Sequence, residues 1–346
     1  MLHGGDIYRN KVKLDFSVNI NPLGIPASVK KALTQALEHC ERYPDIRAER
    51  LMEGLSVMTG ADKEHISGGS GASELFLAIV HAVRPRRTVI PVPSFYGYER
   101  AAMASGCDIL FYEMKEAGEY ALEEGIMDCL TGEMELLFLA NPNNPVGNLI
   151  EGSLLERVVK HCREKGIIAV IDECFLEFSA NENRDTFISR IKDYPNVIVV
   201  RAFTKIYAIP GVRLGYLICG SKELNNNIKR QLPEWNLSVF AQAAGIAACK
   251  EKKYKEETLR LVGEERRYLK TELERSGLRV YSSHTDYLLL KTKLPLYDRL
   301  LEKEILIRDC SSFRGLEKGH YRIAVKRHPE NEMLVKAVRE ILEGQA

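Results

Sequence analysis

The chain has 346 residues, of which 45% are hydrophobic and 28% are charged, and its formal net charge is +1. This composition is that of a globular protein with one large or two ordinary domains. The nearly balanced charge gives no support for a nucleic acid or a strongly anionic membrane as a partner. No apolar stretch is long enough to span a bilayer, and "MLHGGDIYRN" lacks the pattern of a signal peptide, so we expect a cytoplasmic protein.

Eight cysteines are scattered along the chain, and none of them forms a CxxC pair. They are Cys40, Cys107, Cys129, Cys162, Cys174, Cys219, Cys249 and Cys310. We therefore expect neither a zinc or other metal site nor a disulfide framework. Scattered cysteines are typical of a reducing compartment, where most of them act as small core residues.

Helical periodicity alternates with short apolar runs, a pattern that is typical of an α/β fold. Helices are expected over 28–40, 73–83 and 154–166, the last with Gly166 at its stop. Runs of β-branched and aliphatic residues with little alternation occupy 88–92, 136–140, 167–171 and 197–200. Such runs predict parallel strands that are buried on both faces.

The sequence changes character from about Gly245. A long charged amphipathic helix is expected first, then three strands and a closing helix, in the order 254–277, 279–291, 305–309, 321–326 and 329–344. This pattern predicts a smaller α+β domain. We expect an N-terminal arm and helix over 1–44 that packs with the small domain, a large domain over 45–240 and the small domain over 241–346.

Polar or aromatic residues follow each of the four predicted parallel strands. In chain order they are Phe95, Asn141, Asn143, Asn144, Asp172, Glu173 and Lys205. Each has a structural explanation by itself, as a turn former or a helix cap. However, ligands bind outside the carboxyl ends of strands in open α/β sheets, and a lysine suits an apolar segment poorly unless its amine is used. Their joint placement therefore indicates a ligand site.

A glycine-rich stretch, "ISGGSGASELF" (66–76), opens the helix expected over 73–83. Backbone N–H groups and the helix dipole favour a phosphate at such a start, and Arg213 can supply a second contact. The stretch is not a dinucleotide fingerprint, because Glu74 stands in place of the third glycine, and it lacks the Lys-Ser/Thr of a Walker loop. The alternative is a flexible loop with Ser70 or Ser73 as the helix N-cap.

The motifs "NPNNPVG", "VIDECFLEF" and "FTKIYAIPGVRLGY" resemble, in order and spacing, those of the class I and II aminotransferase family of pyridoxal 5′-phosphate (PLP) enzymes. The resemblance covers essentially the whole chain. It implies the α/β fold of type I PLP transferases, with a large domain built on a mostly parallel seven-stranded sheet flanked by helices, and a smaller α+β domain.

By this resemblance, Lys205 binds the cofactor covalently and Asp172 pairs with its ring nitrogen. The resemblance implies further contacts to the cofactor ring from Phe95 and Asn144, and to its phosphate from Gly71, Ala72, Ser73, Thr204 and Arg213. Tyr43, in "RYPD", matches a tyrosine that reaches the phosphate from the neighbouring subunit. The resemblance therefore implies a homodimer with shared active sites.

Within the family, the chain is similar to histidinol-phosphate aminotransferases and to the L-threonine-O-3-phosphate decarboxylases of cobalamin synthesis. The stretches "HGGD", "LDFSVNINPLG" and "ILIRDCSSFRGL" favour the decarboxylase, and Phe175 stands where the histidinol-phosphate enzymes usually have a tyrosine. Arg322 is expected to hold the carboxylate of a small, phosphorylated α-amino acid. Arg308, Asn21 and His3 are expected to contact the same substrate, including its phosphate.

Two residues depart from the family pattern. Ala202 stands where a serine or threonine commonly binds the cofactor phosphate, and Ser238 stands where relatives often carry an asparagine. The motifs also leave the reaction open, because loss of the substrate carboxylate gives decarboxylation and loss of its α-proton gives transamination to 2-oxoglutarate. We favour decarboxylation on the stretches quoted above.

Two other classes of protein compete with a PLP enzyme. A PLP-binding sensor of a transcription regulator needs a DNA-binding domain, for which an arm beginning at residue 3 leaves no room. A nucleotide-binding α/β protein would use "GGSGAS" for phosphate but leaves Lys205, Asp172 and Asn144 unexplained.

Overall fold

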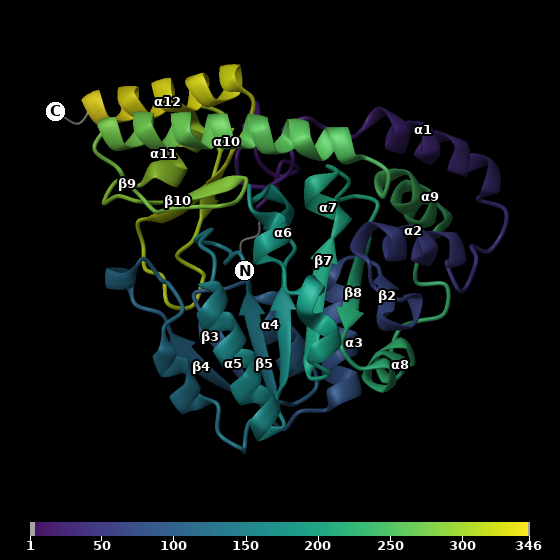
Figure 1. The fold of residues 1–346 in the computed structure, drawn as a ribbon. Coiled ribbons are helices and arrows are strands. Elements are labelled where there is room, and N and C mark those ends of the chain that lie inside the picture. The colour runs from purple at the N-terminus through teal and green to yellow at the C-terminus, as the bar shows by residue number, and fades with distance from the viewer. Residues whose placement is uncertain (1–3, 345–346) are drawn as a thin grey trace.

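A seven-stranded sheet forms the lower half of the molecule as drawn in Figure 1, in a computed structural model that describes residues 4–344. Its strands, in spatial order, are β2 (Ile66–Gly69), β8 (Gly215–Cys219), β7 (Val197–Ala202), β6 (Ile168–Asp172), β5 (Leu136–Ala140), β3 (Arg87–Val92) and β4 (Asp108–Glu113). β8 is antiparallel to both of its neighbours, and the other neighbouring strands are parallel. The prediction of a mostly parallel seven-stranded sheet is thus confirmed.

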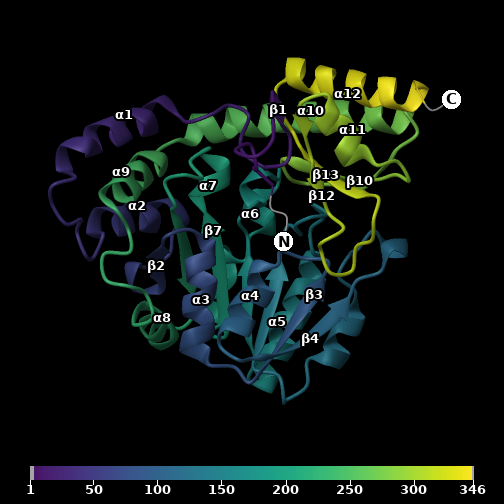
Figure 2. The ribbon, with the colours of Figure 1, turned by 180° about the vertical axis from the view of Figure 1, so that it is seen from behind.

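Helices cover both faces of this sheet (Figures 1 and 2). Those that pack directly on its strands include α3 (Ala72–Val83), α4 (Gly97–Ala104), α5 (Gly152–Lys165) and α8 (Lys222–Lys229). The two-sided cover explains why the central strands are almost continuous aliphatic runs. α5 ends as predicted at Gly166, whose φ of 74° is the left-handed conformation that glycine adopts without strain.

Shorter helices connect these elements. They are α1 (Ala27–Ala36), η1 (Leu37–His39), α2 (Glu49–Thr59), η2 (Lys63–His65), η3 (Glu116–Gly118), η4 (Glu124–Cys129), η5 (Leu176–Phe178), α6 (Glu182–Asp185), η6 (Ile188–Asp193), α7 (Phe203–Ile206) and α9 (Val239–Ala248), where η marks a 3-10 helix. The helix expected over 28–40 is therefore α1 extended by one 3-10 turn. Ser238 caps α9, because its hydroxyl accepts a hydrogen bond from Ala241 N at 3.1 Å.

The C-terminal part contains a four-stranded antiparallel sheet beneath the long helices at the top of Figure 1. Its elements are α10 (Lys252–Arg275), β9 (Arg279–Val280), β10 (Tyr287–Lys291), α11 (Leu296–Glu302), β12 (Arg308–Asp309), β13 (His320–Ala324) and α12 (His328–Glu343). The strand expected over 279–291 is split into two. Between them, the Ser283 hydroxyl forms hydrogen bonds with the backbone of Thr285 and Tyr287, in place of the regular hydrogen bonds between neighbouring strands.

The N-terminal segment is joined to this C-terminal part. β1 (Leu14–Asp15) pairs in parallel with β11 (Ile305–Leu306), and Ala324 N donates to Phe16 O at 2.8 Å. The strand expected over 305–309 is thus shared between two sheets, with β11 bound to β1 and β12 bound to β13. This arrangement brings the segment after β1 to the edge of the large sheet.

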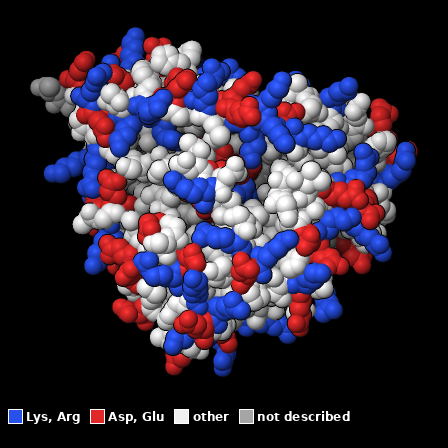
Figure 3. Space-filling view, viewed as in Figure 1, with Lys and Arg blue, Asp and Glu red and all other residues white. Residues whose placement is uncertain are grey.

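Positive and negative side chains are interspersed over the face in Figure 3, as the nearly zero net charge suggests. Among the helices of residues 4–344, none combines the length and the apolar character that crossing a membrane requires.

A buried ion pair fixes the strand ends of the large sheet. Glu173 follows β6 and is fully buried, and its Oε2 accepts hydrogen bonds from Arg201 of β7 at 2.8 and 3.0 Å. Thr186 and the backbone N–H of Phe187 also donate to Glu173. Arg201 in turn reaches Glu182 of α6 at 2.6 Å. Because the partners satisfy each other, the pair holds β6, β7 and α6 in one arrangement.

We expect Arg201→Ala to destabilise the fold by about 3–5 kcal/mol, because Glu173 would keep a buried charge without its guanidinium partner. The midpoint of urea unfolding of the apoprotein measures this loss. Arg87→Ala is the control, since it removes an exposed ion pair with Glu133 and should cost less than about 1 kcal/mol. Unfolding of both variants at the same urea concentration would contradict this role of Arg201.

Candidate active site

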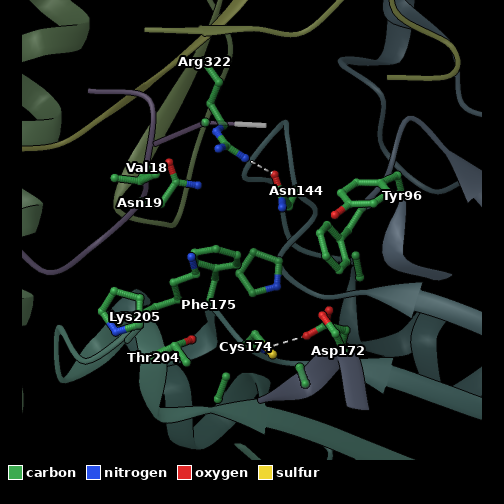
Figure 4. A pocket seen from close by; sticks show the side chains of 18 of the residues that line it. Val18, Asn19, Tyr96, Asn144, Asp172, Cys174, Phe175, Thr204, Lys205 and Arg322 are labelled. Atoms are coloured by element: carbon green, nitrogen blue, oxygen red, sulfur yellow. Dashed lines mark hydrogen bonds between the residues drawn. The ribbon is translucent and has the colours of Figure 1, made fainter. Parts of the chain in front are cut away.

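A cavity of about 290 Å³ opens at the carboxyl edge of the large sheet, beneath the four-stranded sheet (Figure 4). Many of its lining residues come from the loops that follow β3, β5, β6 and β7 and from the start of α3. Of the residues predicted for the site, it is lined by Ala72, Ser73, Phe95, Asn144, Asp172, Thr204, Lys205, Arg213, Arg308 and Arg322. Side chains that are distant in sequence thus meet in one place, as the strand-end pattern predicts.

Lys205 lies on α7, the single helical turn that follows β7. Its Nζ has no hydrogen-bond acceptor within residues 4–344 and lies 5.9 Å from the centroid of the Phe175 ring. Burial lowers the pKa of the amine; Asp286 opposes this shift, whereas Arg322 adds to it. A lowered pKa raises the fraction of neutral amine, which is the form that attacks a carbonyl carbon.

Asp172 ends β6 and is held from two sides. Its Oδ1 accepts a hydrogen bond from the backbone N–H of Cys174 at 2.9 Å, and its Oδ2 accepts one from the Tyr98 hydroxyl at 2.5 Å. Burial raises the pKa of the carboxyl, and the hydrogen bonds from Cys174 and Tyr98 oppose that rise. The result is a fixed carboxylate that can pair with a protonated ring nitrogen.

The N-terminus of α3 forms an anion cradle. Its N-cap is Gly71, with φ of 84°, and not Ser70 or Ser73. A Cβ at Gly71 would lie 2.5 Å from Nη2 of Arg213, so the glycine is what lets that guanidinium approach the helix start. Gly71 itself does not line the cavity but supports the residue that does.

The donors of this cradle fit a phosphate group. The hydroxyls of Ser73 and Thr204 have no partner within the described part of the chain, and both residues line the cavity beside Arg213. Free backbone N–H groups at a helix start add to the attraction for an anion. Ala202 contributes only a methyl group, so Ser73 and Thr204 are the hydroxyls at this end.

Two arginines enter the cavity from the four-stranded sheet. Arg308 and Arg322 are directly opposite each other in the β12–β13 ladder, and both are more than nine-tenths buried. Arg322 donates to Asn144 Oδ1 and, at 3.2 Å, to Ser17 O, while Arg308 donates to Ser312 Oγ at 3.1 Å. Neighbouring like charges are unfavourable across a ladder, so this end of the cavity suits an anionic ligand.

Besides Gly71, two predicted residues within 4–344, Asn21 and Tyr43, do not line the cavity. The Asn21 amide is buried and donates hydrogen bonds to Ile206 O and to the Thr258 hydroxyl, both at 2.7 Å. Tyr43 is 81% exposed and packs on Trp235, with ring centroids 4.8 Å apart. His3 lies outside the described residues.

The cavity also holds residues that the sequence did not single out. They include Ser17, Val18, Asn19, Tyr96, Tyr98, Cys174 and Phe313. Cys174 lies within a motif that the sequence already marks, and Tyr98 is three residues from Phe95. Asn19, two residues before Asn21, occupies the position that we expected of Asn21.

Comparison with known proteins agrees with this geometry. The model of the family "Aminotransferase class I and II" matches residues 11–341. The chain is 37% identical to threonine-phosphate decarboxylase of Salmonella typhimurium, over 96% of this chain and 92% of that protein. It is 31% identical to an adenosylcobalamin biosynthesis bifunctional protein of Leptospira interrogans, over 99% of this chain but 41% of that protein.

A solved structure of histidinol-phosphate aminotransferase from Clostridium acetobutylicum is also similar, with a TM-score of 0.90 and 32% identity. The match covers 96% of this chain and 99% of that chain. The likeness thus extends over nearly the whole chain. The chain therefore belongs to the class I and II aminotransferase family of PLP-dependent enzymes.

Proposed function

We propose that this enzyme decarboxylates a small phosphorylated α-amino acid of the threonine phosphate type, in the synthesis of the cobalamin side chain. The observation that carries the proposal is the pair Arg308 and Arg322, two buried guanidiniums at one end of the cavity. A substrate with a carboxylate and a phosphate brings two anionic groups to that pair. The names of the decarboxylase and cobalamin relatives support the same assignment.

The proposed roles follow from the cavity lining. Lys205 would bond the cofactor, Asp172 would keep a proton on its ring nitrogen, and Phe95 would stack on the ring. Asn144 would bond the ring 3′-oxygen, while the cradle of Ala72, Ser73, Thr204 and Arg213 would take the phosphate. When bound, PLP supplies an electron sink for the charge that is left at the substrate Cα.

The substrate groups determine which bond breaks. Arg322 would hold the carboxylate, and its own position is fixed by Asn144 and by Ser17 O. Decarboxylation breaks the bond between Cα and the carboxyl carbon and releases CO2. The electron pair of that bond stays with Cα, which then takes up a proton. Lys205 would deliver that proton.

Transamination of the histidinol-phosphate type is the second candidate. It is favoured by the similarity to the Clostridium structure and by the lowered pKa of Lys205, because a neutral amine can remove the α-proton of a substrate.

We also propose a cytoplasmic homodimer with shared active sites. Tyr43 and Ile46 are 81% and 57% exposed in the single chain, on the side that carries α1 and α2. An exposed tyrosine beside an exposed isoleucine suits burial against a second copy of the chain. All eight cysteines are free, which fits a reducing compartment.

The purified protein should be yellow, and reduction with borohydride should attach the cofactor irreversibly to the peptide that contains Lys205. Mass spectrometry of that peptide makes the measurement. Lys205→Ala should abolish the attachment, because no other residue is assigned to that bond, whereas Lys222→Ala, on the exposed face of α8, should retain it. A colourless protein that takes up no added PLP would refute the cofactor assignment.

We expect release of CO2 from L-threonine phosphate without any need for 2-oxoglutarate, measured by trapping labelled CO2. Arg308→Gln should lower kcat/KM about 100-fold, because a buried charge-assisted contact of roughly 2–3 kcal/mol is lost.

Arg314→Gln is the matched control, since Arg314 is exposed, pairs with Glu99 and lies in the same segment. Its kcat/KM should stay near that of the wild type. Rapid turnover that depends on 2-oxoglutarate and releases no CO2 would overturn the choice of reaction.

Tyr43→Phe should raise the dissociation constant for PLP roughly tenfold, because a hydrogen bond to a phosphate contributes about 1.5 kcal/mol. Equilibrium dialysis measures the constant, and sedimentation should show a dimer for wild type and variant alike. Tyr268→Phe, on α10, is the control and should leave the constant unchanged. A monomeric wild type that binds PLP normally would rule out shared sites.

A further inference from the structure

Asp286, just before β10, is a fully buried carboxylate to which the site described above gives no role. Its exposure is 0%, and neither oxygen has a hydrogen-bond partner within residues 4–344. Its backbone oxygen accepts a hydrogen bond from Val325 N at 2.7 Å, which fixes the residue beside β13. Buried carboxylates are normally hydrogen-bonded or paired with a cation, so this one needs an explanation.

Asp286 does not line the cavity. The next residue, Tyr287, packs edge-on against Phe175 with ring centroids 5.1 Å apart. Lys205 Nζ lies 5.9 Å from the centroid of that same Phe175 ring. The residue next to Asp286 therefore contacts the same Phe175 ring over which the Lys205 amine lies.

Cationic side chains from several elements lie near enough to Asp286 for their charges to act on its carboxyl. They are Lys205 of α7, Arg322 of β13, Lys326 after β13 and Arg266 of α10. Arg266 also donates to Thr285 O at 2.7 Å, adjacent to Asp286 in the chain. Of these cations, Lys205 has the largest effect on the carboxyl.

The relation is reciprocal. Burial lowers the pKa of the Lys205 amine, the charge of Asp286 raises it, and the charges of Arg322 and Arg213 lower it. The two guanidiniums favour loss of the proton from the amine, whereas the Asp286 carboxylate favours its retention. Burial raises the pKa of Asp286 to about 7, so the carboxyl can change its charge near neutral pH.

We propose that Asp286 is the buried counter-charge of Lys205, which opposes the loss of the proton from the amine when the amine is not bonded to the cofactor. Asp286 is a positioning residue, because it acts through Lys205 and touches no ligand. A protonated amine can give a proton to Cα but cannot remove one from it. The counter-charge therefore favours decarboxylation over transamination, and in this respect the inference rests on the proposed function.

Competitive labelling of the apoprotein with acetic anhydride tests the proposal. The rate at which Lys205 is labelled at each pH gives the pKa of its amine, read by mass spectrometry of the peptide. Asp286→Asn should lower that pKa and so speed labelling at pH 7 about tenfold, since one pKa unit is a tenfold change in neutral amine. Glu265→Gln, which removes another buried carboxylate that bonds Asn331 and His328, should leave the profile unchanged.

A profile of Asp286→Asn that coincides with the wild type overturns the proposal, and so does an equal shift in Glu265→Gln. Should Asp286→Asn not fold, Asp286→Leu makes the same measurement, because Asp286 accepts no side-chain hydrogen bond that leucine would leave unmade. PLP uptake by the wild type is measured separately. Its failure would refute the cofactor role of Lys205 while the labelling comparison still decides the role of Asp286.

Discussion

The active site depends on the register of three neighbouring parallel strands. Ala140 of β5 is paired with Asp172 of β6, and Asp172 is paired with Val200 of β7, so the three strands end at nearly the same level. The loops that follow therefore begin together, and each contributes one kind of polar group to the same cavity. A slip of one residue would turn Asp172 toward the opposite face of the sheet. The buried pair Glu173–Arg201, one step beyond this level, opposes such a slip.

The second constraint is electrostatic. Arg308 and Arg322 lie opposite each other with little exposure to water, an arrangement that costs free energy until an anion lies between them. Part of that cost is offset within the protein, because Arg322 is bound to Asn144 and to Ser17 O. The charges of Lys205 and Arg322 also act on the buried carboxyl of Asp286. An anion bound beside the two guanidiniums would relieve the rest of that cost.

Much of this arrangement could be predicted from local pattern. The aliphatic runs locate the central strands to within one or two residues, and the polar residues after them locate Asp172 and Lys205. The hydrogen bond from the Asn21 amide to Ile206 O could not be predicted, because the two residues are 185 positions apart and no local sequence pattern indicates that contact. Tyr98 was missed for a similar reason, since the angle at which α4 meets the sheet decides whether its hydroxyl reaches Asp172.

The groups assigned to the cofactor and those assigned to the substrate stand on different sheets. Asp172 ends a strand of the seven-stranded sheet and Lys205 lies on the helical turn after another, whereas Arg308 and Arg322 belong to the four-stranded sheet. Substitutions in the smaller sheet can therefore change what is recognised while the chemical apparatus stays intact. Such a division makes the architecture modular in evolution, and it gives a physical reason why proteins named for decarboxylation and for amino transfer share one fold.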